Sequence, residues 1–264
     1  MRALMIFIAG LWLSVDATAG NQPPTAPALS ADAVVELAKR VEGYAAGLGS
    51  QAFIIARQGR PDSDMPEGVS YTHTAVAIYS TIELSSGEQV NGYAIHNLYQ
   101  LTDNAGRSQL VVDYPVDFFW GAATAKAGVI IPTVALEDKL LRLVANNQHT
   151  QLHNPAYSVI ANPFNSHKQN CTEFTLDMIN AAIYQTTDIS RLKANTQQYF
   201  TPQRLSISKA KLFMGSLISD GVSLSDHSGK PATATFTSLL TYLKQYGLVE
   251  QAVTITGNTI TPII

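Results

Sequence analysis

Apolar residues recur every three or four positions in six stretches of the chain, and this period predicts amphipathic helices. Ser30 is a suitable N-cap for the first helix, and Gly247 is suited to end the last one. The helices are expected at 30–48, 133–146, 170–184, 188–199, 208–219 and 235–246.

Runs rich in β-branched and aromatic residues fill the first half of the chain between these helices, and short polar connections separate three of them. Such closely spaced strands form an antiparallel meander. Gly257-Asn258 also predicts a turn between two final strands. The expected strands are 51–57, 71–84, 89–101, 109–115, 252–256 and 259–263. With too few crossovers for a parallel sheet, the pattern predicts one α+β domain over 30–264.

The first nineteen residues have the three parts of a secretory signal peptide. A basic start at Arg2 is followed by an uncharged apolar run at 3–15, and Ala17-Thr18-Ala19 has the small-x-small pattern that signal peptidase cleaves. The run is shorter than the roughly 20 residues that span a bilayer, although an uncleaved anchor is the alternative. We therefore expect cleavage near Ala19, a linker at 20–29, and a periplasmic or secreted chain without a membrane span.

Composition narrows the possible partners. Charged residues make up 14% of the chain, below the roughly 25% of average soluble domains, and 46% of residues are hydrophobic, which excludes a disordered chain. The formal net charge is -3 and no long basic run occurs, so nucleic acid is not expected as a partner. A chain of this length folds without disulfides or a structural metal, and no cofactor is expected.

Cys171 is the only cysteine of the chain, and exported proteins normally pair or bury their thiols. Burial as a small hydrophobe is one interpretation, but the flanking residues 169–170 and 172–173 are polar. The expected helix start places the thiol near free backbone N–H groups, which stabilise a thiolate. Cys171 is therefore a candidate nucleophile, which needs a histidine as base and a polar group to orient that base.

Two histidines lie on neighbouring strands of the predicted meander, His73 on the first and His96 on the next. A tight turn centred between Ser86 and Gly87 would place Gln100 opposite His73, with both histidines on one face and about 13 Å apart along the strands. In this register Gln100 is the better partner for His73, whereas a bulge or an earlier turn would bring His96 to it. A hydrogen-bonded histidine in a half-buried strand is the simpler alternative.

The segments YTHTAVAIY at 71–79 and QNCTEF at 169–174 resemble the His box and the cysteine box of circularly permuted papain-like thiol hydrolases. This NlpC-type superfamily includes the lecithin:retinol acyltransferase-like proteins, and its His-bearing strands precede the Cys-bearing helix, as they do here. More narrowly, segments 53–60, 71–79 and 162–174 resemble an uncharacterised family of exported proteobacterial proteins assigned to that superfamily. The resemblance implies a permuted papain-like fold, with the meander packed against helices and Cys171 at a helix N-terminus.

The resemblance also implies roles for the site residues. Cys171 would be the nucleophile, His73 its base and His96 the polar third member. Backbone N–H groups at the helix start, next to Asn170 and Thr172, would stabilise the oxyanion. The thioester formed on the cysteine would pass its acyl group to water or to an amine.

The expected function is therefore an exported cysteine-dependent hydrolase or acyltransferase that acts on amide or ester bonds. For an exported bacterial protein, a peptide or cell-wall peptide is the favoured substrate and a lipid ester the next. The alternative is a catalytically silent papain-like protein that binds or scaffolds a peptide or lipid.

Two other constellations are weaker. His149 and His153 have the i, i+4 spacing of a helical zinc pair, but no glutamate follows the first histidine, and no metal site is expected. Ser225, Asp226 and His227 are contiguous, whereas a catalytic triad is assembled from distant segments. We expect these three residues to form an exposed polar turn.

Overall fold

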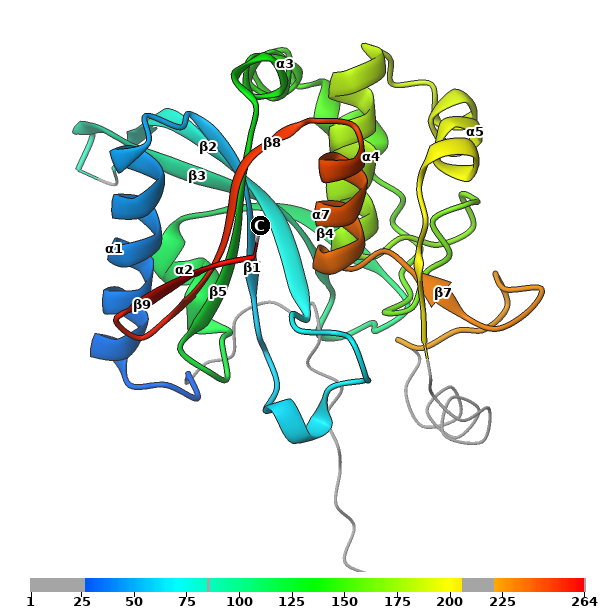
Figure 1. Cartoon of the computed structure of the whole chain (residues 1–264), viewed down its shortest axis with the longest axis horizontal. Coiled ribbons are helices and arrows are strands. Elements are labelled where there is room, and N and C mark those ends of the chain that lie inside the picture. The colour runs from blue at the N-terminus through cyan, green and yellow to red at the C-terminus, as the bar shows by residue number, and fades with distance from the viewer. Residues whose placement is uncertain (1–26, 85, 206–220, 264) are drawn as a thin grey trace, which may run out of the picture.

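A seven-stranded sheet is the centre of the fold in the computed structural model, which describes residues 27–84, 86–205 and 221–263 (Figure 1). Every neighbouring pair of strands is antiparallel, in the order β4-β3-β2-β1-β5-β8-β9. The strands are β1 (Ala52–Arg57), β2 (His73–Glu83), β3 (Gln89–Gln100), β4 (Ser108–Asp113), β5 (Lys126–Pro132), β8 (Val249–Thr256) and β9 (Thr259–Pro262). A separate pair is formed by β6 (Gln203–Arg204) and β7 (Ala232–Thr233).

Helices cover both faces of this sheet (Figure 1). The helices are α1 (Ala31–Gly47), α2 (Pro115–Trp120), α3 (Val134–Ala145), α4 (Cys171–Tyr184), α5 (Ile189–Tyr199) and α7 (Phe236–Gln245), with short 3₁₀ turns η1 (Asp62–Asp64) and η2 (Gln148–Leu152). Helices α1 and α2 pack on one face of the sheet, and α3, α4 and α7 pack on the other. Because both faces are covered, every residue of β1 is buried.

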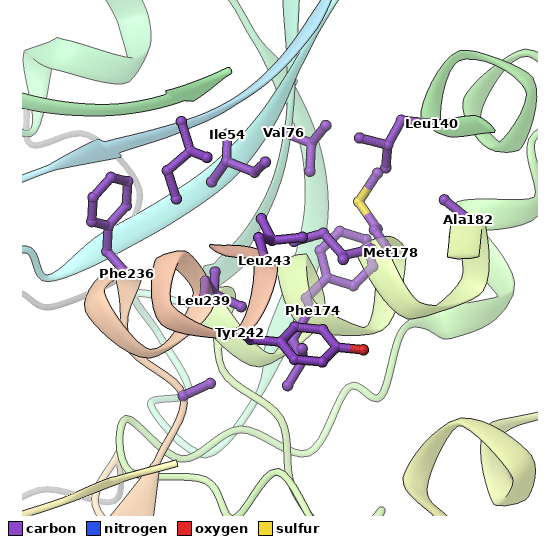
Figure 2. Packing of buried hydrophobic residues seen from close by; sticks show 14 of the residues in the cluster. Ile54, Val76, Leu140, Phe174, Met178, Ala182, Phe236, Leu239, Tyr242 and Leu243 are labelled. Atoms are coloured by element: carbon purple, nitrogen blue, oxygen red, sulfur yellow. The ribbon is translucent and has the colours of Figure 1, made fainter. Parts of the chain in front are cut away.

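The larger hydrophobic core lies between the sheet and helices α3, α4 and α7. Ile54 of β1 and Val76 of β2 face Phe174 and Met178 of α4 there, with Leu243 of α7 between the layers (Figure 2). Phe174 is 1% exposed, and burying a side chain of this size contributes about 1.5–3 kcal/mol. This packing holds the first two turns of α4 against β2.

The predicted mixed α+β arrangement with a large antiparallel sheet is confirmed. Ser30 caps α1 as predicted, because its side chain accepts a hydrogen bond from the Ala33 backbone N–H at 3.3 Å. Several elements were missed, among them β5 and α2. The third meander strand was expected to continue to Pro115, but this proline begins α2, where its missing N–H costs no hydrogen bond.

Two further predictions concern the helices. The helix expected at 208–219 lies outside the described residues. None of the helices that the structure describes is both long enough and apolar enough to span a bilayer.

Candidate active site

Cys171 is the first residue of α4, and Asn170 is its N-cap. The Asn170 Oδ1 atom accepts a hydrogen bond from the Glu173 backbone N–H at 2.9 Å. Its Nδ2 donates to the Val159 carbonyl oxygen and to the Thr233 hydroxyl, each at 3.0 Å. Both ends of this buried amide are therefore engaged in fixing the helix start, so Asn170 positions the cysteine.

The Cys171 sulfur lies against the backbone on both sides of His73. Sγ donates to the Thr72 carbonyl oxygen at 3.9 Å, and the Thr74 backbone N–H donates to the sulfur. The ladder between β2 and β3 begins only at Val76, so the Thr74 backbone N–H lies beyond the paired part of the two strands. The thiol therefore lies where β2 and β3 stop pairing.

His73 is the first residue of β2, and its side chain is fully buried. Nε2 forms a hydrogen bond with Asn97 Oδ1 at 3.0 Å. The ring stacks on Tyr99, with centroids 4.8 Å apart and planes 5° from parallel, and Phe118 of α2 lies 5.5 Å away. Nδ1 has no hydrogen-bond partner among the described residues, and no hydrogen bond joins this ring to Cys171. The ring therefore lies on the face of the sheet that α2 covers, opposite the face on which α4 packs, and one of its nitrogens has no partner among the described residues.

Asn97 is the residue of this site that the sequence analysis missed. It is 1% exposed on β3, and its Nδ2 donates to the Ile95 carbonyl at 3.0 Å and to Asp113 Oδ2 at 3.3 Å. These two acceptors turn Oδ1 toward the imidazole. Asp113 Oδ2 also accepts from the Tyr99 hydroxyl at 2.5 Å, and Arg57 Nη1 donates to the Tyr99 oxygen at 3.3 Å. Asn97 therefore belongs to a buried network that fixes its orientation.

The register between β2 and β3 differs by one residue from the predicted one. Glu83 pairs with Gln89, so five residues, 84–88, connect the strands, and the connection is centred on residue 86. His96 consequently pairs with Val76 instead of Ala77. A shift of one residue moves every side chain of a strand to the opposite face of the sheet.

This shift removes His96 and Gln100 from the face that carries His73. The His96 ring lies against the His149 ring instead, with centroids 4.8 Å apart. Gln100 Nε2 donates to the Ala105 carbonyl oxygen at 2.7 Å. The structure therefore places Asn97, and neither of the two predicted candidates, beside His73.

Burial keeps the thiol and the imidazole neutral. It raises the pKa of Cys171, and hydrogen bonds from Thr74 and Thr172 offset this only in part. It also lowers the pKa of His73 well below its usual value, and the positive charge of Arg57 adds to this effect. The thiolate expected at neutral pH is therefore not the resting state, because desolvation outweighs the favourable helix start.

Thr172, the other predicted oxyanion residue, joins the first turn of α4 to β2. Its hydroxyl donates to Thr74 Oγ1 at 3.3 Å and lies 3.9 Å from Cys171 Sγ. Thr175 Oγ1 donates to the Thr74 carbonyl oxygen at 3.2 Å. These contacts fix the sulfur relative to the backbone of β2.

Residues 44–243 match a family described as an uncharacterized protein conserved in bacteria (DUF2145). The chain belongs to this family. The matched region contains Cys171, His73 and Asn97, together with the sheet from β1 to β5. No curated protein and no solved structure matches the chain.

The two histidines that suggested a zinc pair have different partners. His149 lies in η2 against His96, and burial lowers its pKa. His153 Nε2 forms a hydrogen bond with Ser108 Oγ at 3.1 Å. Across residues 27–84, 86–205 and 221–263, no group of three or more His, Cys, Asp or Glu side chains is arranged to hold a metal ion.

The turn expected at 225–227 is present at Ser225 and Asp226, and Ser225 is exposed, but the side chains of Asp226 and His227 are not. Asp226 is 6% exposed, and its Oδ2 accepts from the Asn162 backbone N–H at 2.8 Å. His227 Nε2 forms a hydrogen bond with the Ile160 carbonyl oxygen at 2.7 Å. The two side chains satisfy backbone groups of a distant loop, so they connect two loops and are less exposed than their polarity suggests.

Proposed function

We propose that this protein is a papain-like, cysteine-dependent hydrolase or acyltransferase in which Cys171 is the nucleophile, His73 its base and Asn97 the residue that orients the base. One observation carries the proposal. The Cys171 sulfur contacts the backbone on both sides of His73, whose Nε2 is held by Asn97 and whose Nδ1 is unpartnered within the described residues. Thiol catalysis requires a base within hydrogen-bond reach of the nucleophile and a third group that orients the base. Asn97 supplies the orienting group, whereas the His73 ring lies on the α2 face of the sheet and has to turn toward the α4 face to reach the thiol.

The neutral resting pair sets the order of proton transfers. Once the His73 ring has turned within reach of the thiol, the thiol proton passes to its Nδ1 as Sγ attacks the carbonyl carbon of an amide or ester. The imidazolium then protonates the leaving amine or alcohol, which departs and leaves a thioester on Cys171. Water or an amine next attacks the thioester, its proton passes to His73, and the released thiolate takes that proton back. Backbone N–H groups at the start of α4 stabilise the oxyanion in both steps.

The proposed substrate is a peptide or cell-wall peptide amide, with a lipid ester as the second class. The support is the signal-peptide pattern at 1–19, which would bring the chain to the periplasm or the cell exterior. The resemblance of segments 71–79 and 169–174 to permuted papain-like hydrolases, with the histidine before the cysteine, supports the same class of chemistry.

The single thiol makes a specific test possible. The purified protein is incubated with p-nitrophenyl acetate, and the acetylated chain is measured by intact mass spectrometry. We expect an adduct in the wild type, none in Cys171→Ala, and a rate at least about 100-fold lower in His73→Gln, because general base catalysis contributes about 10²–10⁴-fold.

His167→Gln is the matched control, since His167 is exposed and its substitution removes an imidazole elsewhere. It should react like the wild type. If His73→Gln acetylates as fast as His167→Gln, the proposal is wrong.

Burial favours a second candidate, the catalytically silent binding protein. Cys171 is 4% exposed and His73 0% exposed, and burial shifts both pKa values toward the neutral forms. A protein that retains the fold but binds a peptide or lipid without turnover would show this arrangement. A wild-type protein that does not acetylate when folded, but does so at Cys171 in urea, would support this candidate.

A further inference from the structure

A cavity of about 210 Å³ lies beside α4, and neither Cys171 nor His73 lines it. Its walls include Glu173 and Asp177 of α4, Lys193 of α5, and Lys168 from the loop before α4. Pockets for drug-sized ligands measure roughly 300–1,000 Å³. This cavity therefore suits a smaller molecule.

Three ionisable groups are buried together in its wall. Lys193 Nζ donates to Glu173 Oε1 at 2.6 Å and to the two carboxylate oxygens of Asp177 at 2.9 Å each. The side chains of these residues are between 1% and 9% exposed. Two carboxylates thus share one ammonium group, and all three of its N–H donors are in use.

The oxygen left over is Glu173 Oε2. It is buried and has no hydrogen-bond partner among the described residues. Burial raises the pKa of Glu173 to about 8, with the neighbouring negative charge of Asp177 adding to the effect and the Lys193 ammonium opposing it. With this pKa, Glu173 is protonated at neutral pH when no ligand is bound, and its buried proton has no acceptor among the described residues. A bound cation that donates to Oε2 would favour the ionised form.

Lys168 supplies the opposite charge in the same cavity. It is half-buried, and its ammonium group makes no ion pair or hydrogen bond within the parts of the chain that the structure describes. Glu173 and Lys168 therefore line the same small cavity, and neither the Glu173 Oε2 atom nor the Lys168 ammonium group has a partner among the described residues. A ligand that carries one ammonium and one carboxylate group would satisfy both.

We propose that this cavity binds a small zwitterion of the α-amino acid class, with its ammonium group donating to Glu173 Oε2 and its carboxylate pairing with Lys168 Nζ. The site does not depend on the thiol chemistry, and Cys171→Ala should bind the ligand like the wild type.

The test is isothermal titration calorimetry of the purified protein with glycine, L-alanine and D-alanine as probes. At least one probe should bind with a stoichiometry of one. N-acetylation of the bound probe removes its ammonium group and should weaken binding by about 10- to 100-fold, as expected for a lost charge-assisted hydrogen bond. Conversion of its carboxylate to the amide should weaken binding by about two- to fivefold, since Lys168 is closer to solvent.

Two substitutions locate the site. Glu173→Gln should reproduce the loss caused by N-acetylation, and Lys168→Met the loss caused by amidation. Lys244→Met is the control, because Lys244 is exposed on α7 and does not line the cavity. The proposal is overturned if no probe binds at millimolar concentration, if the N-acetylated probe binds as well as the free one, or if Lys168→Met binds like Lys244→Met.

Discussion

Replacement of Asn97 by alanine would test whether this residue holds the candidate base. Asn97 makes three hydrogen bonds inside the protein, to the His73 ring, the Ile95 carbonyl and Asp113. Asp113 Oδ2 keeps the Tyr99 hydroxyl as a partner when the amide is removed. The His73 ring does not keep a partner, because its Nδ1 already lacks one among the described residues.

The expected loss of stability follows from this count. The bonds to Ile95 and Asp113 contribute about 1 kcal/mol net each, and the imidazole nitrogen left without a partner costs about 1–3 kcal/mol, so Asn97→Ala should lower the free energy of unfolding by about 3–5 kcal/mol. Urea unfolding followed by circular dichroism measures this difference, provided that the slope against urea is unchanged.

Asn91→Ala is the matched control on the same strand. Asn91 is exposed, and its Oδ1 accepts one hydrogen bond, from Thr81 Oγ1 at 3.1 Å. This variant should stay within about 0.5 kcal/mol of the wild type. If Asn97→Ala is no less stable than Asn91→Ala, the buried network around His73 does not have the role assigned to it. A fall in the rate of Cys171 acetylation, measured where both variants are folded, would separate positioning of the base from stability.

Three further predictions concern the thiol, the second histidine pair and the core. Burial raises the pKa of Cys171, so alkylation of the folded protein by iodoacetamide should reach half its maximal rate above the roughly pH 8.5 of a free thiol and return to that value in urea. A midpoint below that of the unfolded chain would contradict the assigned neutral thiol. Burial lowers the pKa of His96 to about 4. The neutral ring therefore contributes stability that is present above about pH 6.5, the value in an unfolded chain, and is lost as the pH falls toward 4. His96→Gln should consequently lose less stability than the wild type over this range in thermal unfolding, and parallel losses would refute the assignment. Phe174→Ala should cost about 3–5 kcal/mol because it empties a buried site, whereas Val134→Ala on the exposed face of α3 should cost at most about 0.5 kcal/mol. Similar midpoints for these two variants in urea would exclude the packing shown for α4.

The sequence by itself determined the elements that have a clear period or a local signal. The three-to-four residue spacing predicted α1, and Ser30 was recognised as its cap because N-capping depends on a few adjacent residues. The strands of the meander were recognisable from their composition and short connections. The polar surroundings of Cys171 and the strand that carries His73 also drew attention to these two residues without any knowledge of their contacts.

Elements with a weak local signal were missed. The residues of β5 form a short apolar run that is buried or half-buried throughout, because helices cover both faces of the sheet, so no alternation marks it as a strand. In α2 a six-residue helix follows directly from a strand, and one proline decides where the change occurs. Length and periodicity contain too little information to assign either element.

Only the tertiary structure decided which residue stands beside His73. The connection between β2 and β3 has five residues instead of the expected tight turn, and this odd number shifts the pairing by one position. Since side chains alternate along a strand, the shift exchanges His96 for Asn97 on the face that carries His73. The protonation states were decided in the same way. A helix start favours a thiolate locally, but the sheet and helices packed around Cys171 exclude water, and this desolvation keeps the thiol neutral.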